Sequence, residues 1–222
     1  LAEHQVPSDD IDELVLRLMK ALENLQTDHE LPALINALDG HFIPPVSGGD
    51  LIRNPDSLPT GRNIHGFDPF RLPSAYALLE GQRQAEQLTL RHFEDTGEMP
   101  TSIALVLWGT DNLKSEGIAI GQALALIGAR PRFDSYGRLS GAELIPVNEL
   151  GRSRVDVIVT LSGIFRDLLP MQTQLLAEAA YLAAAADEPL ELNPIRRNSL
   201  EYQAKHNCDL DTAALRVFSN SE

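Results

Sequence analysis

The stretch that decides the fold reads IALVLWGTDNLKSEG and occupies residues 103–117. Its first six residues are an unbroken run of apolar, mostly branched or aromatic side chains, which is typical of a strand buried in a parallel sheet. Eight of the nine residues that follow are small or polar, and we expect the nine to form a loop. An apolar segment at 116–127 that stops at Gly128 then predicts a helix. The stretch is therefore one strand–loop–helix unit.

A second unit of the same kind lies further along the chain. Residues 155–161 read VDVIVTL, residues 162–167 read SGIFRD, and a helix is expected from about 168 to 187. Strands that alternate with helices predict the α/β class, here a mostly parallel, Rossmann-like sheet flanked by helices. The other predicted strands lie at 131–135 and 143–146, with a last one beginning at Leu215, and the other predicted helices lie at 9–26, 31–38, 73–96 and 194–206.

The chain is expected to have three parts. Residues 1–40 form an N-terminal helical segment, residues 41–72 form an extended loop, and residues 73–222 form the α/β domain, truncated at its C-terminus. Proline and glycine punctuate the middle part, yet it carries too much apolar content for disorder, so we expect an ordered loop packed across a surface. The start, LAEH, is not a natural initiation, and both ends suggest a fragment of a longer protein.

Composition narrows the class of protein. The 18 basic and 32 acidic residues give a net charge of −14, which disfavours binding to nucleic acid or to an anionic membrane. No apolar run approaches the roughly 20 residues that span a bilayer, and no signal peptide is visible. A single cysteine, Cys208, excludes an internal disulfide, so the expected compartment is a reducing cytoplasm.

Polar residues at the ends of the two apolar strands are the first candidates for function. Ligands of open α/β sheets collect at the carboxyl ends of the strands, so Asp111, Lys114, Arg166 and Asp167 would converge if the two strands are neighbours. A structural interpretation competes with this one, because such residues also cap helices and form salt bridges. A tryptophan at a strand end, here Trp108, likewise belongs to the core more often than to a ligand site.

A second candidate is the loop segment from Arg53 to Asn63, which holds two Arg-Asn pairs, at 53–54 and 62–63. An arginine can fork onto a carboxylate such as a ligand propionate, whereas the alternative is that these residues lock the loop onto its own domain. The sequence has no G-x-x-x-x-G-K-[ST] loop, no G-x-G-x-x-G, no G-x-S-x-G elbow and no metal-ligand spacing among its six histidines. We therefore expect neither an ATP site nor a protein-held metal site on this chain.

Four motifs, in order, resemble segments of the large subunits of magnesium chelatase and cobaltochelatase. They are LPTGRN at 58–63 with FDP at 67–69, LWGTDNLK at 107–114, ELGRSRVDV at 149–157, and SGIFRD at 162–167. Together they are far more specific than any one alone, and the resemblance covers about residues 40–220. DNLK at 111–114 and RVFSN at 216–220 resemble the magnesium branch, the large (H) subunits of chlorophyll and bacteriochlorophyll synthesis.

The resemblance implies a ligase that inserts Mg²⁺, its substrate ion, into protoporphyrin IX. It also implies that ATP is hydrolysed by separate AAA+ motor subunits, in agreement with the missing ATP motif. The family carries a His- and Glu-bearing segment of the type THG…E, a candidate for metal delivery or proton removal, which this sequence lacks. The main catalytic groups are therefore expected elsewhere in the intact subunit, and this chain alone is expected to be inactive.

Site residues follow from the resemblance as expectations. Trp108 would stack on the macrocycle, and Arg62 or Arg166 would pair with its propionates. Asp111 and Glu116 are weaker candidates for assistance at the metal, since Mg²⁺ prefers oxygen ligands. The complete set of substrate-binding candidates is Arg62, Asn63, Trp108, Thr110, Lys114 and Arg166.

Other functions stay open at this point. A cobaltochelatase large subunit would insert Co²⁺ into hydrogenobyrinate diamide. A non-catalytic domain would dock the motor subunits, which the acidity and the long packed loop would suit. A ligand-binding module of the periplasmic type fits the α/β pattern but neither the four motifs nor the missing signal peptide.

Overall fold

The computed structural model describes residues 8–47, 55–65 and 68–218. The chain divides into two compact units, Leu1–Phe67 and Asp68–Glu222. The predicted Arg53-Asn54 pair, Phe67 of the first family motif, and Ser219-Asn220 of the last segment lie outside the described residues.

The first unit contains both helices predicted for it, α1 (Ser8–Gln26) and α2 (Glu30–Leu38). A carboxylate oxygen of Asp28 accepts hydrogen bonds from the backbone N–H groups of Glu30 and Leu31, at 2.9 and 3.2 Å, and so satisfies the free donors at the start of α2. The segment predicted as one extended loop contains a short 3₁₀ helix and a parallel strand pair. These elements are three residues each, too short to show a hydrophobic period: β1 (Pro45–Ser47), η1 (Pro55–Ser57) and β2 (Asn63–His65).

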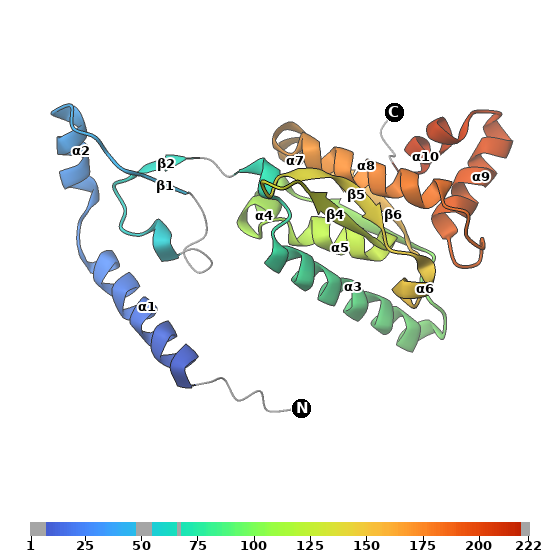
Figure 1. Ribbon diagram of the computed structural model, residues 1–222, viewed down its shortest axis with the longest axis horizontal. Helices are drawn as coiled ribbons and strands as arrows, with labels where there is room; N and C mark the ends of the chain where they lie inside the picture. Colours follow the sequence, from blue (N-terminus) through green and yellow to red (C-terminus); the bar gives the residue numbers. More distant parts are fainter. Residues whose placement is uncertain (1–7, 48–54, 66–67, 219–222) are drawn as a thin grey trace. The chain divides into compact units, whose positions relative to one another are not determined.

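The second unit mixes helices and strands, so the predicted α/β class is confirmed (Figure 1). Its elements in chain order are η2 (Pro69–Arg71), α3 (Ala75–Thr96), β3 (Ser102–Leu107), α4 (Gly109–Lys114), α5 (Ile118–Ile127), β4 (Ala129–Phe133), β5 (Leu139–Leu144), α6 (Val147–Leu150), β6 (Asp156–Leu161), α7 (Gly163–Leu168), α8 (Pro170–Ala185), α9 (Pro194–His206) and α10 (Leu210–Phe218). No helix in the described part of the chain is both long enough and apolar enough to cross a membrane.

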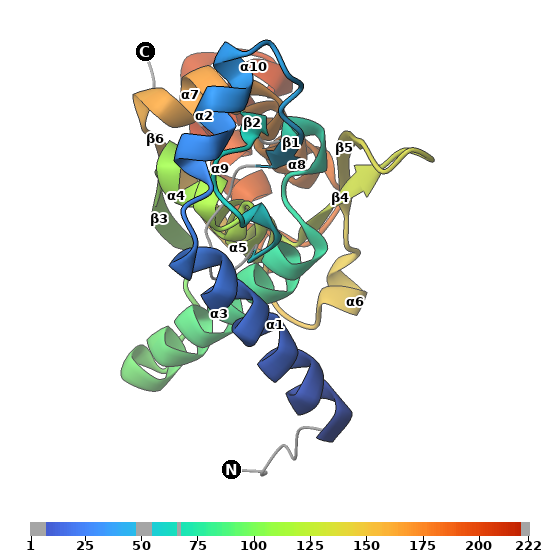
Figure 2. The same ribbon diagram turned by 90° about the vertical axis from the view of Figure 1, so that its left-hand side faces the viewer.

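The two apolar runs that begin the predicted strand–loop–helix units pair with each other as the parallel strands β3 and β6. β3 and β6 align from Ser102 opposite Asp156 to Leu107 opposite Leu161. β4 and β5 instead form an antiparallel hairpin, because the turn between them is too short for the crossover that parallel strands need. A carboxylate oxygen of Asp134 accepts from two backbone N–H groups of that turn, and Figure 2 shows the turn projecting from the body of the unit.

Three predicted elements are wrong, and one of them is the second strand-end loop, 162–167, since residues 163–168 form the helix α7. The polar stretch after β3 is not a continuous loop, because residues 109–114 close a short helix, α4, in which the N–H groups of Asn112 and Ser115 donate to the carbonyls of Trp108 and Asp111. The last strand, expected from Leu215, is the helix α10. Its first turn is capped by Asp209, and Ala213 is fully buried, so a helix with one packed face replaces the expected strand.

Helix α5 is the centre of the second unit. It contacts β3, β4 and β6, and α8, and seven of its ten residues are buried, which explains its apolar composition on nearly all sides. Helix α3 lies outside it (Figure 1) and approaches so closely that a Cβ on Gly81 would lie 2.4 Å from the backbone nitrogen of Gln122. Gly121 meets the carbonyl of Ala77 in the same way.

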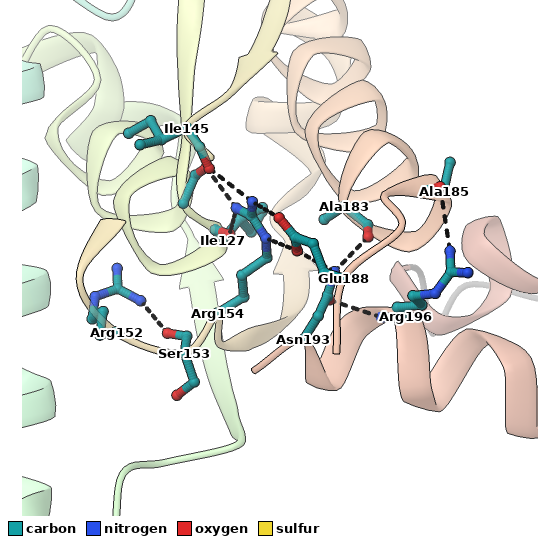
Figure 3. Close-up of polar contacts among 11 residues, drawn as sticks. Ile127, Ile145, Arg152, Ser153, Arg154, Ala183, Ala185, Glu188, Asn193 and Arg196 are labelled. Carbon is teal, nitrogen blue, oxygen red and sulfur yellow. Dashed lines mark hydrogen bonds and ion pairs between the residues drawn. The ribbon is translucent and has the colours of Figure 1, made fainter. Parts of the chain in front are cut away.

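A buried arginine connects the loops at one end of this core (Figure 3). Arg154 has no exposed side-chain surface and forms a two-pronged ion pair with Glu188, with N–O distances of 2.6 and 2.7 Å. It also donates to the carbonyls of Ile127, Gly128 and Ile145, at 3.1, 2.8 and 2.7 Å. One side chain therefore joins the end of α5, the segment after β5 and the connection between α8 and α9.

Replacing Arg154 with methionine keeps much of its aliphatic volume and removes every one of these hydrogen bonds. The variant leaves the Glu188 carboxylate without its cation in a largely buried position, so we expect the free energy of unfolding to fall by about 3–5 kcal/mol. Urea denaturation followed by circular dichroism measures this loss. Arg130→Met is the matched control, because its pair with Glu143 is exposed to water and should contribute little. Equal losses in the two variants would contradict the role given to Arg154.

The same ion pair makes stability depend on pH. Its hydrogen bonds hold the pKa of Glu188 below the usual value of 4.5. A carboxyl with a depressed folded pKa stabilises the protein above its unfolded pKa, and this contribution is lost as pH falls through the folded pKa. The stability difference between the wild type and Arg154→Met should therefore be constant at neutral pH and shrink below about pH 4.5. Urea titrations from pH 7 to pH 3 test this, and a difference that grows with acid would refute it.

Candidate functional site

The two polar segments meet at one edge of the β3–β6 pair, as the sequence predicted for neighbouring strands. Because the strands are parallel and end in register, α4 and α7 begin side by side, and the two helices are in contact. The backbone N–H of Ser162 donates to the carbonyl of Leu107 at 3.1 Å, which carries the pairing one residue beyond the strands. Residues 108–117 and 162–168 are called the strand-end rim below.

A serine hydroxyl and a glycine lock the two halves of the strand-end rim together. The hydroxyl of Ser162 accepts from the N–H of Gly109 at 3.0 Å and from the N–H of Phe165 at 3.2 Å, so it joins the halves and caps α7 at once. A Cβ on Gly109 would lie 2.5 Å from Cγ2 of Ile164 and 2.6 Å from the nitrogen of Phe165. Sequence reasoning missed these two positioning residues, although both stood in the quoted motifs.

Asn112 fixes the shape of the first half from inside. Its side chain is fully buried, and its amide nitrogen donates to the carbonyl of Trp108 at 2.8 Å. The main-chain carbonyl of Asn112 accepts a hydrogen bond from the N–H of Gly117 at 2.8 Å. The side-chain oxygen of Asn112 has no hydrogen-bond partner within the described residues, which is uncommon for a buried polar atom.

The charged residues predicted at the two strand ends all lie on the outside of the strand-end rim. Asp111, Lys114, Glu116, Arg166 and Asp167 lie at the water-facing side, and so does Thr110. Arg166 reaches Asp167 at 3.3 Å, so the salt bridge considered as the structural interpretation is present. Both side chains keep about 70% of their surface in water, with 73% for Arg166 and 69% for Asp167, so the pair is weak and the guanidinium is open to a stronger carboxylate partner.

Trp108 is not a core residue, so the general expectation for a tryptophan at a strand end is wrong here. It exposes 56% of its surface, since it follows a strand whose final residue, Leu107, is fully buried. Three further apolar side chains at this edge are about half exposed: Val106 at 54%, Ile164 at 49% and Leu168 at 47%. Exposed apolar groups rimmed by charge are typical of a ligand or partner surface.

Glu116 occupies a special backbone position. Its φ of +55° is left-handed, as is that of Gly117 at +93°, and the two residues make the turn between α4 and α5. The carbonyl of Glu116 accepts from the N–H of Ser74 at 3.0 Å, and the hydroxyl of Ser74 caps α3. The turn is thus tied to the start of α3, which leaves the carboxylate of Glu116 exposed on a fixed backbone.

Arg62 and Asn63 belong to the first unit and bond to their own loop. The guanidinium of Arg62 donates to the carbonyls of Leu58 and Pro59, at 2.5 and 3.2 Å. The side chain of Asn63 donates to the carbonyl of Ile43 at 3.1 Å. These bonds agree with the interpretation that the residues lock the loop, and a role in substrate binding stays a prediction.

No group of three or more His, Cys, Asp or Glu side chains within residues 8–47, 55–65 and 68–218 is arranged to hold a metal ion. The carboxylates of the strand-end rim, Asp111, Glu116 and Asp167, are exposed, and Asp167 is paired with Arg166.

Comparison with known proteins gives consistent matches over nearly the whole chain. The family model described as CobN/Magnesium Chelatase matches residues 2–222. The H subunit of the magnesium chelatase of Rhodobacter capsulatus is 63% identical over 199 residues, and that of Cereibacter sphaeroides is 60% identical over 199 residues. Each alignment covers 89% of this chain and 16% of the relative, so the chain spans about one sixth of the length of these proteins.

A solved structure has the same fold. The catalytic subunit of cobaltochelatase from Mycobacterium tuberculosis matches with a TM-score of 0.75 and 37% sequence identity. The match covers 83% of this chain and 16% of that chain. The arrangement of elements described above is therefore part of a much larger protein in that relative as well.

The contact between the halves of the strand-end rim can be tested with two glycines. Gly109→Ala places a methyl group against Ile164 and the backbone of Phe165, so we expect a loss of about 2 kcal/mol or more in the free energy of unfolding. Gly163→Ala is the matched control, because a Cβ there has no neighbour within 4 Å and its stability should be unchanged or slightly higher. Thermal and urea unfolding measure both, and a Gly109→Ala variant as stable as the control would refute the contact.

Proposed function

The chain belongs to the CobN/Magnesium Chelatase family, and from this premise we propose that it is part of the large, porphyrin-binding subunit of a magnesium chelatase. In this proposal the intact subunit inserts Mg²⁺, the substrate ion, into protoporphyrin IX. The residues of this chain supply one wall of the tetrapyrrole site, and the remaining five sixths of a subunit of that length supply the rest.

The choice of the magnesium branch rests on the degree of similarity. The two magnesium-chelatase relatives share far more of this sequence than the cobaltochelatase structure does. The DNLK segment at 111–114 lies in the strand-end rim itself. Since the rim is the part of the chain that would contact the tetrapyrrole, its sequence supports the same branch as the whole chain.

The observation that carries the proposal is the exposed face of the strand-end rim. Protoporphyrin IX is a flat apolar ring with two propionates, so it needs an apolar platform and cations at its border. Trp108, with Ile164 and Leu168, offers half-exposed apolar surface, and Lys114 and Arg166 are cations at the same edge. Thr110, which lies between Trp108 and Lys114 in the sequence, adds a hydroxyl.

The chemistry of metal insertion assigns roles to the carboxylates. Two pyrrole N–H protons must leave the macrocycle, and Mg²⁺, which dehydrates reluctantly and prefers oxygen ligands, must be delivered to its nitrogens. Asp111 and Glu116 are carboxylates of the rim, and Glu116 sits on a turn whose backbone is fixed by Ser74. They would accept protons or hold the hydrated ion near the ring, in support of catalytic groups elsewhere in the subunit.

The energy source is assigned to other chains. The sequence contains no phosphate-binding loop of the G-x-x-x-x-G-K-[ST] type. We therefore assign ATP hydrolysis to AAA+ motor subunits that act on the intact large subunit. The acidic character of this chain is compatible with contacts to such partners, and its net charge is −14.

Variants of the intact subunit test whether the strand-end rim is a wall of the tetrapyrrole site. Trp108→Ala and Arg166→Ala should each weaken protoporphyrin IX binding by about tenfold or more, because the first removes apolar platform and the second removes a cation that would pair with a propionate. Binding is measured by the change in porphyrin absorbance, which does not depend on protein tryptophan. Arg91→Ala is the control, since Arg91 is an exposed arginine on α3 outside the strand-end rim. Unchanged affinity in both rim variants would remove this edge from the site.

A competition experiment separates the two branches of the family. The intact subunit should bind protoporphyrin IX in preference to hydrogenobyrinate diamide, and the rim variants should reduce that preference. Preferential binding of hydrogenobyrinate diamide, with Co²⁺ as the inserted ion, would assign the chain to the cobalt branch. Capture of the motor subunits with no tetrapyrrole binding at all would assign it to docking.

A further inference from the structure

Strand β3 lies at an open edge of its sheet. Within the described residues, the sheet consists of β3 and β6 alone, and no third strand pairs with β3. Leu107 is the one buried residue of β3, and Val106 exposes 54% of its surface. Strand β6 differs, because it also contacts α10 and three of its six residues are buried. The side of β3 is therefore the more open side of the pair.

The backbone of β3 directs half of its hydrogen-bonding groups away from β6. The N–H of Asp156 donates to the carbonyl of Thr101 at 3.0 Å. At the other end of the strands, the N–H of Ser162 donates to the carbonyl of Leu107 at 3.1 Å. Since the N–H and C=O groups of successive residues in a strand point to alternate sides, the odd-numbered residues of this segment bond to β6. The even-numbered residues direct these groups to the open edge, where no described residue bonds to them. They are Ser102, Ala104 and Val106.

The sequence of β3 has none of the features that protect an exposed strand edge. Natural edges are blunted by charged residues, by proline, by bulges or by short length. Strand β3 reads SIALVL, has no charge and no proline, and pairs with β6 over six residues without a register shift. Such an uninterrupted apolar run is typical of a parallel strand that has a neighbour on each side and both faces covered.

The β4–β5 hairpin of the same chain has the opposite pattern. Strand β4 reads ARPRF, so it carries two arginines and a proline. A register shift also interrupts its pairing between Arg132 and Phe133. These are ordinary protections of an edge that stays in water. The contrast within one chain indicates that the edge of β3 is made for a partner strand.

We propose that the open edge of β3 binds an apolar strand from the part of the intact subunit that lies outside these 222 residues. The chain spans about one sixth of the length of its magnesium-chelatase relatives, so a large part of such a subunit is available to supply the strand. A strand fits this edge because its own N–H and C=O groups complement those of Ser102, Ala104 and Val106. The proposal rests on membership of the family and is independent of which tetrapyrrole the subunit binds.

Amide hydrogen exchange, resolved to single residues, tests the proposal on the 222-residue chain and on the intact subunit. In the chain, the amides of Ala104 and Val106 should exchange freely, whereas those of Ile103 and Leu105, which face β6, should be protected. In the intact subunit, Ala104 and Val106 should exchange at least about 100-fold more slowly, because a partner strand accepts their hydrogen bonds. Free exchange in both samples, or protection already present in the chain, would overturn the proposal. Protection that appears only as the concentration of the chain is raised would assign the edge to a second copy and would overturn it as well.

Proline variants distinguish a partner strand from other kinds of cover. Proline lacks the N–H group, so it is tolerated at a free strand edge but not where that N–H bonds to a neighbour. Ala104→Pro should leave the unfolding midpoint of the 222-residue chain nearly unchanged, whereas in the intact subunit it should return the amide of Val106 to fast exchange. Leu105→Pro is the matched control on the same strand, and it should destabilise both samples because its N–H faces β6. Protection of Val106 that survives Ala104→Pro, or equal losses of chain stability in the two variants, would refute the partner strand.

Discussion

The buried ion pair between Arg154 and Glu188 is the interaction on which the rest of the second unit depends. A charge withdrawn from water costs several kcal/mol unless its partners are complete, and here the arginine uses a two-pronged carboxylate and three carbonyls. These partners come from separate places in the chain. Since no subset of them satisfies the guanidinium, the loops that carry them must all be in place together.

The position of β6 follows from this constraint. At and after Arg154, three successive backbone N–H groups donate to carbonyls of other segments. Arg154 donates to Leu192, Val155 to Leu126, and Asp156 to Thr101. The strand therefore enters between the α8–α9 connection, the end of α5 and the residue before β3. This entry sets the register with β3, and the register in turn brings Gly109 beside Phe165 beyond the far ends of the strands. The geometry of the strand-end rim is thus determined at the other end of the strands.

The sequence predicts those parts of the fold whose signal is local and long. Strands β3 and β6, their shared edge, and the helices α3 and α9 follow from runs and periods of apolar residues. The expected burial of β3 is wrong, because Leu107 is the one buried residue of that strand. The short helix α4 does not follow from such a signal, because its residues are the same ones that make a polar loop, and their helical turn depends on the buried side chain of Asn112. Both strands of the hairpin were predicted, but their antiparallel direction was not, and α10 was predicted as a strand, since strand direction and the packing of Ala213 depend on the rest of the fold. Arg154 was visible in a motif, but its partner lies 34 residues away, and nothing in the sequence indicates that distance.

The candidate site shows the same division. The charged residues were found because polar groups after an apolar strand are an ordinary signal, and the exposure of Trp108 was missed because burial is a property of the whole fold. Within the strand-end rim, the contacts that hold the two halves use backbone groups, one hydroxyl and a glycine, and they do not involve the side chains of Trp108, Lys114 or Arg166. A surface built in this way keeps its shape when Trp108, Lys114 or Arg166 is replaced. Changes in ligand affinity caused by such replacements can therefore be read as lost contacts with the ligand, separately from any loss of stability.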